Sequence, residues 1–402
     1  MKFSLTEEQL MIREMAARFA EHEVAREAGG LDEAELFDRR SFDAMAQLGF
    51  TALPWPEEDG GAGGGFLSFV LVLEELSRVS ASLGAALWAH VFLSAWPLHR
   101  FGSVELKRHY LRKLIDGNSM GTGVLPGAVD PNTTLRIGVS GQLQLQGDGA
   151  EEECYVLNGQ QKYILGGTTA DFFIIYAVTG ESAAGRRKRY SAFIIEKDSP
   201  GLLIQPVTKK LGLRSAGMAH LKFQDCRVPK RQRIGRDGQG GAIAGRAAAG
   251  VRYGLAAVAA GITQGAAEAA LGYAKARSQF GKPIAKHQAV AWMLADMRTA
   301  ADASKLLVYQ AAWQEDRGLT DGEGWEAALA LSFAADAAMT STIHAVQVYG
   351  GYGYMKEYPV ERFMRDAKAV QIFKGLDLSP KMPQPKGRGS GGSGRERGRR
   401  HG

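Results

Sequence analysis

The sequence predicts an α+β fold made of three segments, because its local pattern changes twice along the chain. Apolar residues recur at helical spacing through residues 1–119, whereas short β-branched and aromatic runs bounded by turn residues occupy residues 120–233. Residues 234–378 return to long, alanine-rich helical patterns. Helices followed by strands and then by helices indicate helical segments packed beside an antiparallel sheet.

The N-terminal segment is predicted to be a helical domain. Its first helix begins after Thr6, a residue type that caps helix N-termini, and two glutamates follow where they favour the positive end of the helix dipole. Residues 53–66 are rich in Pro and Gly and predict a loop. Residues 81–96 are apolar on nearly every side, so we expect a buried helix in which His90 is a hydrogen-bonded core residue.

The middle segment is predicted to be an antiparallel β domain, and the last segment a set of long helices. The dipeptide Asn158-Gly159 stands between two strand-like runs and is a strong signal for a hairpin turn. The predicted strands include residues 143–146, 155–157, 172–177, 191–196 and 221–223, and the predicted helices are residues 254–276, 286–317 and 324–348.

The composition favours a soluble protein of a reducing cytoplasm. We expect no membrane span, because no apolar run approaches the roughly 20 residues that one needs. The N-terminus alternates acidic with apolar residues, unlike a signal or transit peptide. The two cysteines, Cys154 and Cys226, are too few for a disulfide framework or a metal cluster. We therefore expect both to be buried thiols, and we predict no metal site.

The formal net charge of +6 comes from the C-terminal tail, residues 379–402. The tail holds seven basic residues and one acidic residue, so the remainder of the chain is neutral. Its Gly, Ser, Pro and Arg composition predicts a disordered tail. Basic charge without aromatic residues or a recognition motif does not indicate specific nucleic-acid binding.

Three stretches are suited to holding a cofactor. Residues 155–177 read YVLNGQQKYILGGTTADFFIIYA, where an aromatic residue and small residues after a turn can lie against a planar ring. Residues 276–297 read ARSQFGKPIAKHQAVAWMLADM, in which Arg277 offers a fixed fork of donors for phosphate. Residues 347–374 read QVYGGYGYMKEYPVERFMRDAKAVQIFK, in which paired glycines let the backbone approach a ligand.

These stretches, with KLGLRS at residues 210–215 and FQDCRVP at residues 223–229, resemble the acyl-CoA dehydrogenase family of flavoproteins. The resemblance extends to about Phe373. It implies the fold of that family, with an N-terminal helical domain, a middle antiparallel β domain and a C-terminal four-helix bundle. It also implies FAD as cofactor and a homodimer or homotetramer. The implied activity is oxidation of an acyl thioester, on coenzyme A or an acyl carrier protein, with an electron-transfer flavoprotein or oxygen as the acceptor.

The same resemblance assigns residues to the cofactor and the substrate. Arg277 and Phe280 are expected to meet the pyrophosphate and adenine of FAD, and a neighbouring subunit is expected to supply the glycine pair. Arg252 and Gly375 are expected to contact the substrate. The expected cofactor-binding residues are Tyr163, Ile164, Leu165, Arg277, Phe280, His287, Gln288, Gln347, Gly350 and Gly351.

The flavin-facing segments depart from the family pattern in two places. Tyr163 replaces the usual tryptophan, and Leu165 replaces a threonine or serine, so that a hydroxyl donor to the flavin is lost. Residues 123–134 read GVLPGAVDPNTT and keep only fragments of the loop that covers the flavin in the family.

The residue that should remove a proton from the substrate is also missing. In the family a carboxylate takes the α-proton of the thioester while the flavin accepts a hydride. The usual positions of that carboxylate are occupied here by Lys374 and Val251, and neither residue is acidic. Residues 374–380 read KGLDLSP instead of a sequence like EGTSEIQ, and only Gly375 is retained.

Four explanations of this departure remain open. Glu357, Asp366 or Asp377 could be the base, although the first two match ordinary family positions and are expected to form salt bridges. The substrate could be a β-keto acid whose decarboxylation needs no base, as in a decarboxylating desaturase or an epoxyketone-synthase-like monooxygenase. The chain could bind flavin and catalyse weakly. The reading frame could have shifted near Lys374.

Lys374 itself has three interpretations. A buried lysine could act as the base, since burial lowers the pKa of an ammonium group. It could instead attract a substrate carboxylate, or be solvated without a role. A flavin-free scaffold or tail-mediated binding protein is the alternative outside the enzyme class.

Overall fold

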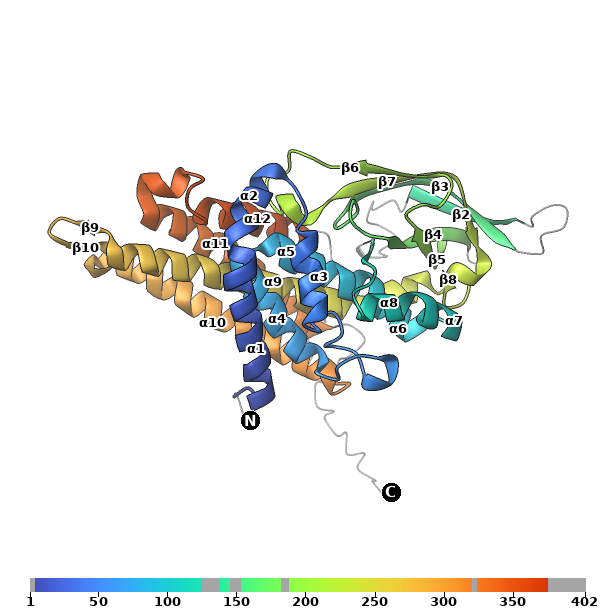
Figure 1. The fold of residues 1–402 in the computed structure, drawn as a ribbon, viewed down its shortest axis with the longest axis horizontal. Helices are drawn as coiled ribbons and strands as arrows, with labels where there is room; N and C mark the ends of the chain where they lie inside the picture. Colours follow the sequence, from blue (N-terminus) through green and yellow to red (C-terminus); the bar gives the residue numbers. More distant parts are fainter. Residues whose placement is uncertain (1–3, 125–137, 145–152, 182–187, 320–323, 375–402) are drawn as a thin grey trace, which may run out of the picture.

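The computed structural model describes residues 4–124, 138–144, 153–181, 188–319 and 324–374 (Figure 1). The N-terminal helices lie across a bundle of long helices, and a β-sheet extends from the other side of the molecule (Figure 1). The basic tail, Gly375, Asp377 and most of the 123–134 loop lie outside the described residues. The predictions made for them therefore stay predictions.

The N-terminal segment folds into helices, as predicted, and Thr6 caps the first. Its Oγ1 accepts a hydrogen bond from the Gln9 backbone N–H at 3.2 Å, and the Gln9 side chain accepts one from the Thr6 N–H at 3.0 Å. The helices are α1 (Glu7–Phe19), α2 (Ala25–Ala34), α3 (Arg39–Gln47), α4 (Gly65–Val79), α5 (Ala81–Ala89), α6 (Trp96–Phe101), α7 (Val104–Leu106) and α8 (Arg112–Ile115), with π-helical turns at Ala20–Val24, His90–Ala95 and Lys107–Leu111.

His90 is the hydrogen-bonded core residue that its apolar surroundings predicted. Its Nε2 lies 3.1 Å from the Leu114 carbonyl oxygen, and its Nδ1 lies 3.4 Å from the Gly121 backbone nitrogen. A neutral ring that donates from Nε2 and accepts at Nδ1 satisfies both contacts. Burial lowers the pKa of His90 to about 4, so the ring stays uncharged at neutral pH.

The middle segment is an eight-stranded sheet in the order β6-β7-β3-β2-β4-β5-β8, with β1 paired to β4. Most neighbouring strands are antiparallel, as predicted, but β1 and β2 each run parallel to β4. The strands are β1 (Gly121–Gly123), β2 (Gly138–Gln144), β3 (Cys154–Ile164), β4 (Phe172–Glu181), β5 (Lys188–Glu196), β6 (Leu202–Pro206), β7 (Ala219–Pro229) and β8 (Arg233–Ile234).

The hairpin predicted at Asn158-Gly159 is wrong, because both residues lie inside the continuous strand β3. The pairing of β3 with β7 shifts register between Leu157 and Gly159, which marks a bulge. The Asn158 side chain accepts a hydrogen bond from the Asp225 N–H at 2.8 Å and donates one to the Asp225 carboxylate at 2.9 Å. These hydrogen bonds to a distant strand thus hold Asn158 and Gly159 in an extended strand, although the dipeptide also suits a turn.

The C-terminal segment is a bundle of four long helices, in agreement with the family resemblance. The first of them, α9, runs through the middle of the bundle and packs on the other three and on α4. The helices are α9 (Gly240–Ala276), α10 (Gln288–Asp316), α11 (Trp325–Tyr349) and α12 (Val360–Lys374), and a small hairpin of β9 (Ser278–Gln279) and β10 (Lys282–Pro283) joins α9 to α10.

Three stretches are long and apolar enough to cross a membrane, judged by length and composition alone, contrary to our expectation from the sequence. They are Ala81–Phe101, Gly240–Ala276 and Trp325–Tyr354. The apolar window of the first is 100% buried inside the fold, and that of the second is 72% buried. The apolar character of these two therefore serves core packing, because other parts of the chain surround them, whereas the window of the third is 44% buried. Cys154 and Cys226 are buried free thiols, as expected.

Glycines let α9 and α4 approach closely where they cross. A Cβ atom added at Gly265 would lie 2.2 Å from the Arg78 carbonyl oxygen, and one added at Gly261 would lie 2.3 Å from the Glu74 carbonyl oxygen. Gly272, further along α9, has nothing within 4 Å of such an atom. The two helices therefore need glycine at the crossing and tolerate a side chain beyond it.

We expect Gly265→Ala to destabilise the protein by about 1–3 kcal/mol, because the new methyl group forces two backbones apart. The matched change Gly272→Ala should stabilise it by up to about 1 kcal/mol, since alanine favours a helix interior. Urea unfolding of the two variants beside the unmodified protein measures both effects. Equal stabilities for the two variants would contradict this account of the helix crossing.

Candidate cofactor site

The end of β3 presents one aromatic ring outward and buries the residues that follow it. Tyr163 is 59% exposed, whereas Ile164 and Leu165 are each 3% exposed. Tyr163 also has a φ of 60°, which lies in the left-handed region and is unfavourable for a residue with a Cβ atom. Ile164 and Leu165 therefore anchor the end of β3 in the protein interior, whereas the ring of Tyr163 is accessible to a ligand.

His220, on the neighbouring strand β7, contacts Tyr163 and was missed from the sequence. The Tyr163 backbone N–H donates a hydrogen bond to His220 Nδ1 at 3.1 Å. The two rings meet edge to face, with centroids 4.8 Å apart. Neither residue belongs to a motif that joins them, since they are separated by 57 positions in the sequence.

Leu165 offers no hydrogen-bond donor from its side chain, and its backbone carbonyl is already in use. Its side chain is buried, and its carbonyl oxygen accepts a hydrogen bond from Thr122 Oγ1 at 2.6 Å. Thr122 is itself 1% exposed, so its hydroxyl is occupied inside the protein. It does not replace the donor that the family has at this point.

A second group of predicted residues surrounds the β9–β10 hairpin. Phe280, at its tip, is 92% exposed and has a φ of 53°. The His287 ring faces Phe280 with centroids 6.1 Å apart, and its Nε2 lies 3.3 Å from the Gln279 carbonyl oxygen. Gln288 begins α10 beside it and is exposed. This end of the molecule thus offers an aromatic ring and polar side chains to a ligand.

The glycine pair after α11 joins this second group within the same chain. The Arg277 guanidinium lies 5.8 Å from the centre of the Tyr352 ring, which directly follows Gly350 and Gly351. Both glycines and Gln347 are exposed, and a Cβ atom on either glycine would meet nothing within 4 Å. We had expected two different subunits to supply Arg277 and the glycines. Their adjacency favours one subunit supplying both.

The two groups of predicted residues are not brought together by one chain. The β9–β10 hairpin projects from the far end of the helical bundle, and β3 lies in the sheet on the other side of the molecule (Figure 1). An FAD molecule that meets both groups therefore needs a second copy of the chain. The exposed rings suit flat stacking, Arg277 suits a phosphate, and the open glycines suit close backbone approach, so these residues fit FAD.

The two usual positions of the catalytic carboxylate carry no acid. Lys374 Nζ lies 2.5 Å from Asp336 Oδ2 in an ion pair between α12 and α11. Val251 is fully buried in α9, and its carbonyl oxygen accepts a hydrogen bond from Trp88 Nε1 at 3.0 Å. The next residue, Arg252, is 8% exposed. A lysine that is paired with a carboxylate is poorly suited to accept a proton.

Two of the acids considered as alternative bases, Asp366 and Glu357, lie among the described residues. Asp366 is 2% exposed and accepts a hydrogen bond from the Leu213 backbone N–H at 2.6 Å. Glu357 is exposed, and among the described residues it has no ion pair, so the salt bridge expected for it is not formed. Asp366 likewise forms no ion pair among the described residues, so the salt bridge expected for it is not formed either, and its carboxylate has a backbone contact in the protein interior.

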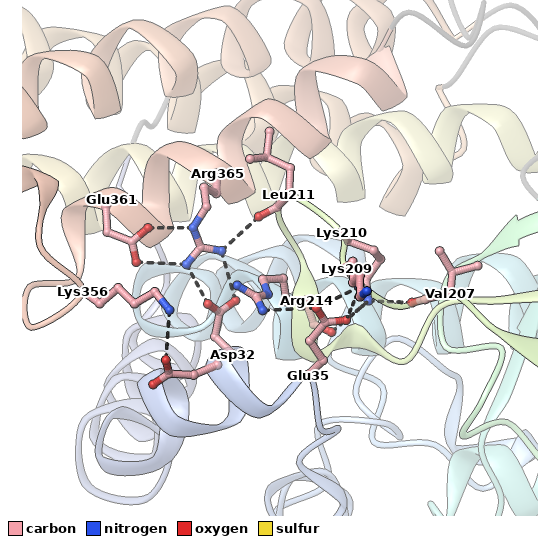
Figure 2. A network of polar contacts seen from close by, with 11 residues as sticks. Asp32, Glu35, Val207, Lys209, Lys210, Leu211, Arg214, Lys356, Glu361 and Arg365 are labelled. Carbon is pink, nitrogen blue, oxygen red and sulfur yellow. Dashed lines mark hydrogen bonds and ion pairs between the residues drawn. The ribbon is translucent and has the colours of Figure 1, made fainter.

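A network of charged side chains connects the N-terminal helices, the loop between β6 and β7, and helix α12 (Figure 2). We call this network the three-way junction. Arg365 on α12 contacts Asp32 on α2 at 2.6 Å and Glu361 at 2.6 Å, and it donates to the Leu211 carbonyl oxygen at 3.0 Å. Leu211 belongs to the loop between β6 and β7. The three-way junction consists of Asp32, Glu33, Glu35, Lys209, Lys210, Leu211, Arg214, Lys356, Glu361 and Arg365, in which Lys356 pairs with Glu33.

Asp366 adjoins the three-way junction, and burial raises the pKa of its carboxyl to about 7. Its folded pKa thus exceeds the ordinary value of 3.8, so the folded protein binds the extra proton more tightly than the unfolded chain. Stability is therefore fully present at low pH and is lost as the pH rises from about 4 to about 7.

We expect Asp366→Asn to abolish this loss, because an amide keeps an oxygen for the Leu213 N–H and does not ionise. The stability advantage of the variant should grow between pH 4 and pH 7, on the order of 1.4 kcal/mol for each pH unit. Urea unfolding at several pH values measures it. Asp336→Asn is the control, because hydrogen bonds from Lys374 and Gln371 outweigh burial and lower the pKa of that partly exposed acid. A pH-independent advantage of Asp366→Asn would contradict the assignment.

The chain consists of an N-terminal helical segment, a β-sheet and a C-terminal helical bundle, and its exposed aromatic and cationic residues lie in two separate places. This combination is typical of a class of protein, the three-segment flavoprotein oxidoreductases. Family models give the particular family. The N-terminal domain of acyl-CoA dehydrogenase matches residues 6–118, the middle domain matches residues 141–226, and the C-terminal domain matches residues 238–377. The chain belongs to the acyl-CoA dehydrogenase family, whose members are FAD-dependent oxidoreductases acting on CH–CH donors.

Individual relatives agree with this assignment. The chain is 42% identical to a short-chain specific acyl-CoA dehydrogenase of Clostridium acetobutylicum, over 95% of this chain and 98% of the relative. It superposes on butyryl-CoA dehydrogenase from Megasphaera elsdenii with a TM-score of 0.85 and 36% identity, covering 94% of this chain and 97% of that one. A structure of PigA with FAD and proline gives a TM-score of 0.83 and 30% identity, over 94% and 97% of the two chains.

Proposed function

We propose that this protein is an FAD-dependent oxidoreductase that acts on a short acyl-CoA thioester and has lost the usual carboxylate base. The short chain is proposed because the relatives include a short-chain specific dehydrogenase and a butyryl-CoA dehydrogenase. Bound FAD would supply the acceptor for a hydride from the substrate. The protein's own residues would hold the ring, the phosphates and the thioester.

The observation that carries the proposal is the contrast between the cofactor surface and the base position. Tyr163, Phe280 and Arg277 present two exposed rings and a guanidinium, as a flavin nucleotide requires. Lys374, in contrast, is held by Asp336. A positioned base typically contributes 10²–10⁴-fold to a proton transfer. The ordinary desaturation should therefore be slow in this protein.

The ion pair of Lys374 also bears on the alternatives. A lysine already neutralised by Asp336 attracts a substrate carboxylate less strongly than a free one would. This weakens the decarboxylating interpretation, in which Lys374 anchors a β-keto acid. That interpretation, an acyl-carrier-protein substrate and a weakly catalytic flavin-binding protein remain outcomes of the experiments below.

We propose that the working form is a homo-oligomer. The two cofactor-facing groups lie too far apart in the fold to serve one cofactor within one chain (Figure 1). The bundle also exposes large apolar side chains and a groove of about 620 Å³ between α10 and α11, which suit a protein contact. The exposed large apolar residues on α10 and α11 are Trp292, Leu306, Trp313, Leu329, Phe333 and Ile343. We also propose a cytoplasmic location and leave electron-transfer flavoprotein and oxygen as candidate acceptors.

We expect the purified protein to bind FAD and Arg277→Ala to bind it about 10–100-fold more weakly, because a charge-assisted contact to phosphate is lost. Arg298→Ala is the matched control on α10, since Arg298 pairs only with Asp302 among its described ion-pair partners. Titration of protein fluorescence with FAD measures both affinities. A protein that stays colourless and does not take up FAD would overturn the proposed function.

We expect a carboxylate at position 374 to raise the rate at which butyryl-CoA reduces the bound flavin under anaerobic conditions. Lys374→Glu alone would face Asp336, so the variant to test is Lys374→Glu with Asp336→Asn. The control is Lys374→Gln with Asp336→Asn, which removes the ion pair without adding a base. The expected gain is about 10²–10⁴-fold over the control.

A null result in that comparison would show that the base is not the only missing element. Leu165, which lacks the family hydroxyl, would then be the next position to restore. Reduction of the flavin by a β-keto acid alone, with release of CO₂, would instead favour the decarboxylating interpretation over the proposed function.

A further inference from the structure

The bulge in β3 leaves the Tyr163 backbone without an ordinary partner in the sheet. After the register shift at Leu157/Gly159, the ladder between β3 and β7 is regular from Gly159 opposite Phe223 to Gln161 opposite Leu221, and it resumes at Ile164 opposite Ala219. Residues 162 and 163 therefore face the single residue His220. A backbone N–H at such a shift needs another acceptor, and the His220 ring nitrogen Nδ1 provides it at 3.1 Å.

The conformation of Tyr163 also needs support. Its φ of 60° is rarely adopted by a residue with a Cβ atom, and aromatic residues gain nothing locally that would compensate. His220 supplies two contacts to this one residue. Its Nδ1 accepts from the backbone, and its ring meets the Tyr163 ring at an interplanar angle of 82°. One side chain thereby sets both the backbone and the ring of Tyr163.

The left-handed conformation occurs at the point where β3 ends and the chain turns inward. Ile164 and Leu165 are buried directly after it, while the Tyr163 ring is more than half exposed. The strain is thus used to present one ring from the sheet while its neighbours anchor the strand. Since Tyr163 is the exposed ring of the flavin-facing segment, its orientation decides how a flavin can lie against β3.

We propose that His220 is a positioning residue for the cofactor: in its neutral form it accepts the Tyr163 N–H, holds Tyr163 in the left-handed conformation and thereby orients the Tyr163 ring toward the flavin. The inference rests on the proposed function for the identity of the ligand. The contact between His220 and Tyr163 stands without it.

The proposal requires a particular tautomer. Nδ1 accepts a hydrogen bond only when it carries no proton, so the ring proton lies on Nε2. Protonation of His220 would set two N–H groups against each other and break the contact. The charged side chains that face His220 are Lys162 on β3 and Lys222 two positions along β7, while its partner on β6 is the uncharged Gln205. Burial, and then Lys162, lower the pKa of His220, which favours the neutral ring at physiological pH.

Two variants separate the acceptor from the ring. His220→Asn keeps an oxygen acceptor near the place of Nδ1 and does not titrate, whereas His220→Phe keeps a ring and has no acceptor. His22→Asn, at an exposed histidine of the N-terminal segment, controls for the loss of a histidine elsewhere. Each protein is compared with and without FAD.

The first measurement is hydrogen–deuterium exchange of the peptide that contains Tyr163, in protein without FAD and corrected for intrinsic rates. At pH 8 the unmodified protein and His220→Asn should protect this amide equally. In His220→Phe it should exchange about five- to tenfold faster. Well below the ordinary histidine pKa of about 6.5 the unmodified protein should lose protection, while His220→Asn should keep it. Equal exchange in all three proteins at both pH values would overturn the proposal.

The second measurement is the visible spectrum and the midpoint potential of bound FAD across the same pH range. His220→Phe should shift both at every pH, and the unmodified protein should approach it at low pH, whereas His220→Asn should not. Unchanged spectra in His220→Phe would refute the role toward the cofactor. Failure of every protein, including the unmodified one, to bind FAD would instead refute the proposed function, and the exchange result would still decide whether His220 holds Tyr163.

Discussion

The arrangement of the three segments depends on the guanidinium of Arg365. It bonds to Asp32 of the N-terminal helices, to Glu361 of its own helix and to the Leu211 carbonyl of the loop in the middle segment (Figure 2). Asp32 and Arg365 are both largely buried, with side chains 7% and 14% exposed. A buried ion pair adds little net stability over apolar packing, but losing one partner costs about 3–5 kcal/mol, so the pair enforces one geometry.

Arg365 and its partner Leu211 are connected by short stretches of chain to Lys374 and to the strand β7 that contacts Tyr163, respectively. On one side, α12 continues from Arg365 to Lys374, which occupies a usual position of the family's carboxylate. On the other, the loop that contains Leu211 and Leu213 leads into β7, whose second residue is His220. Asp366 adds a second attachment by accepting the Leu213 N–H. The position of the base site relative to the flavin-facing strand is therefore set from one place, where helix α12 meets the β6–β7 loop.

The sequence predicted the parts of this protein that depend on local pattern. The capping by Thr6, the long alanine-rich helices and the core environment of His90 follow from neighbours within a few positions, and all were confirmed. The hairpin at Asn158-Gly159 failed because the deciding partner, Asp225, lies 67 positions away. His220 was missed for the same reason. No local pattern links it to Tyr163, and only the register of β3 with β7 brings the two together.

The prediction that no stretch is long and apolar enough to span a membrane was wrong, but length and apolar content do not tell whether protein or lipid surrounds a helix. The divided cofactor site likewise could not be located from motifs, because adjacency of Arg277 and Tyr352 is a property of the fold. What surrounds them is decided by packing between distant segments.

The base position can change without disturbing the rest of the protein, and this explains how a family fold can lack the family's carboxylate. Lys374 sits at the end of α12, and its partner Asp336 is 56% exposed, so their ion pair is a surface pair of the kind worth at most about 1 kcal/mol. Tyr163, in contrast, is fixed by the register of two strands and by His220. A substitution at residue 374 should therefore leave the folding energy and the orientation of Tyr163 almost unchanged, because the Lys374 ion pair and the Tyr163 contacts involve different residues.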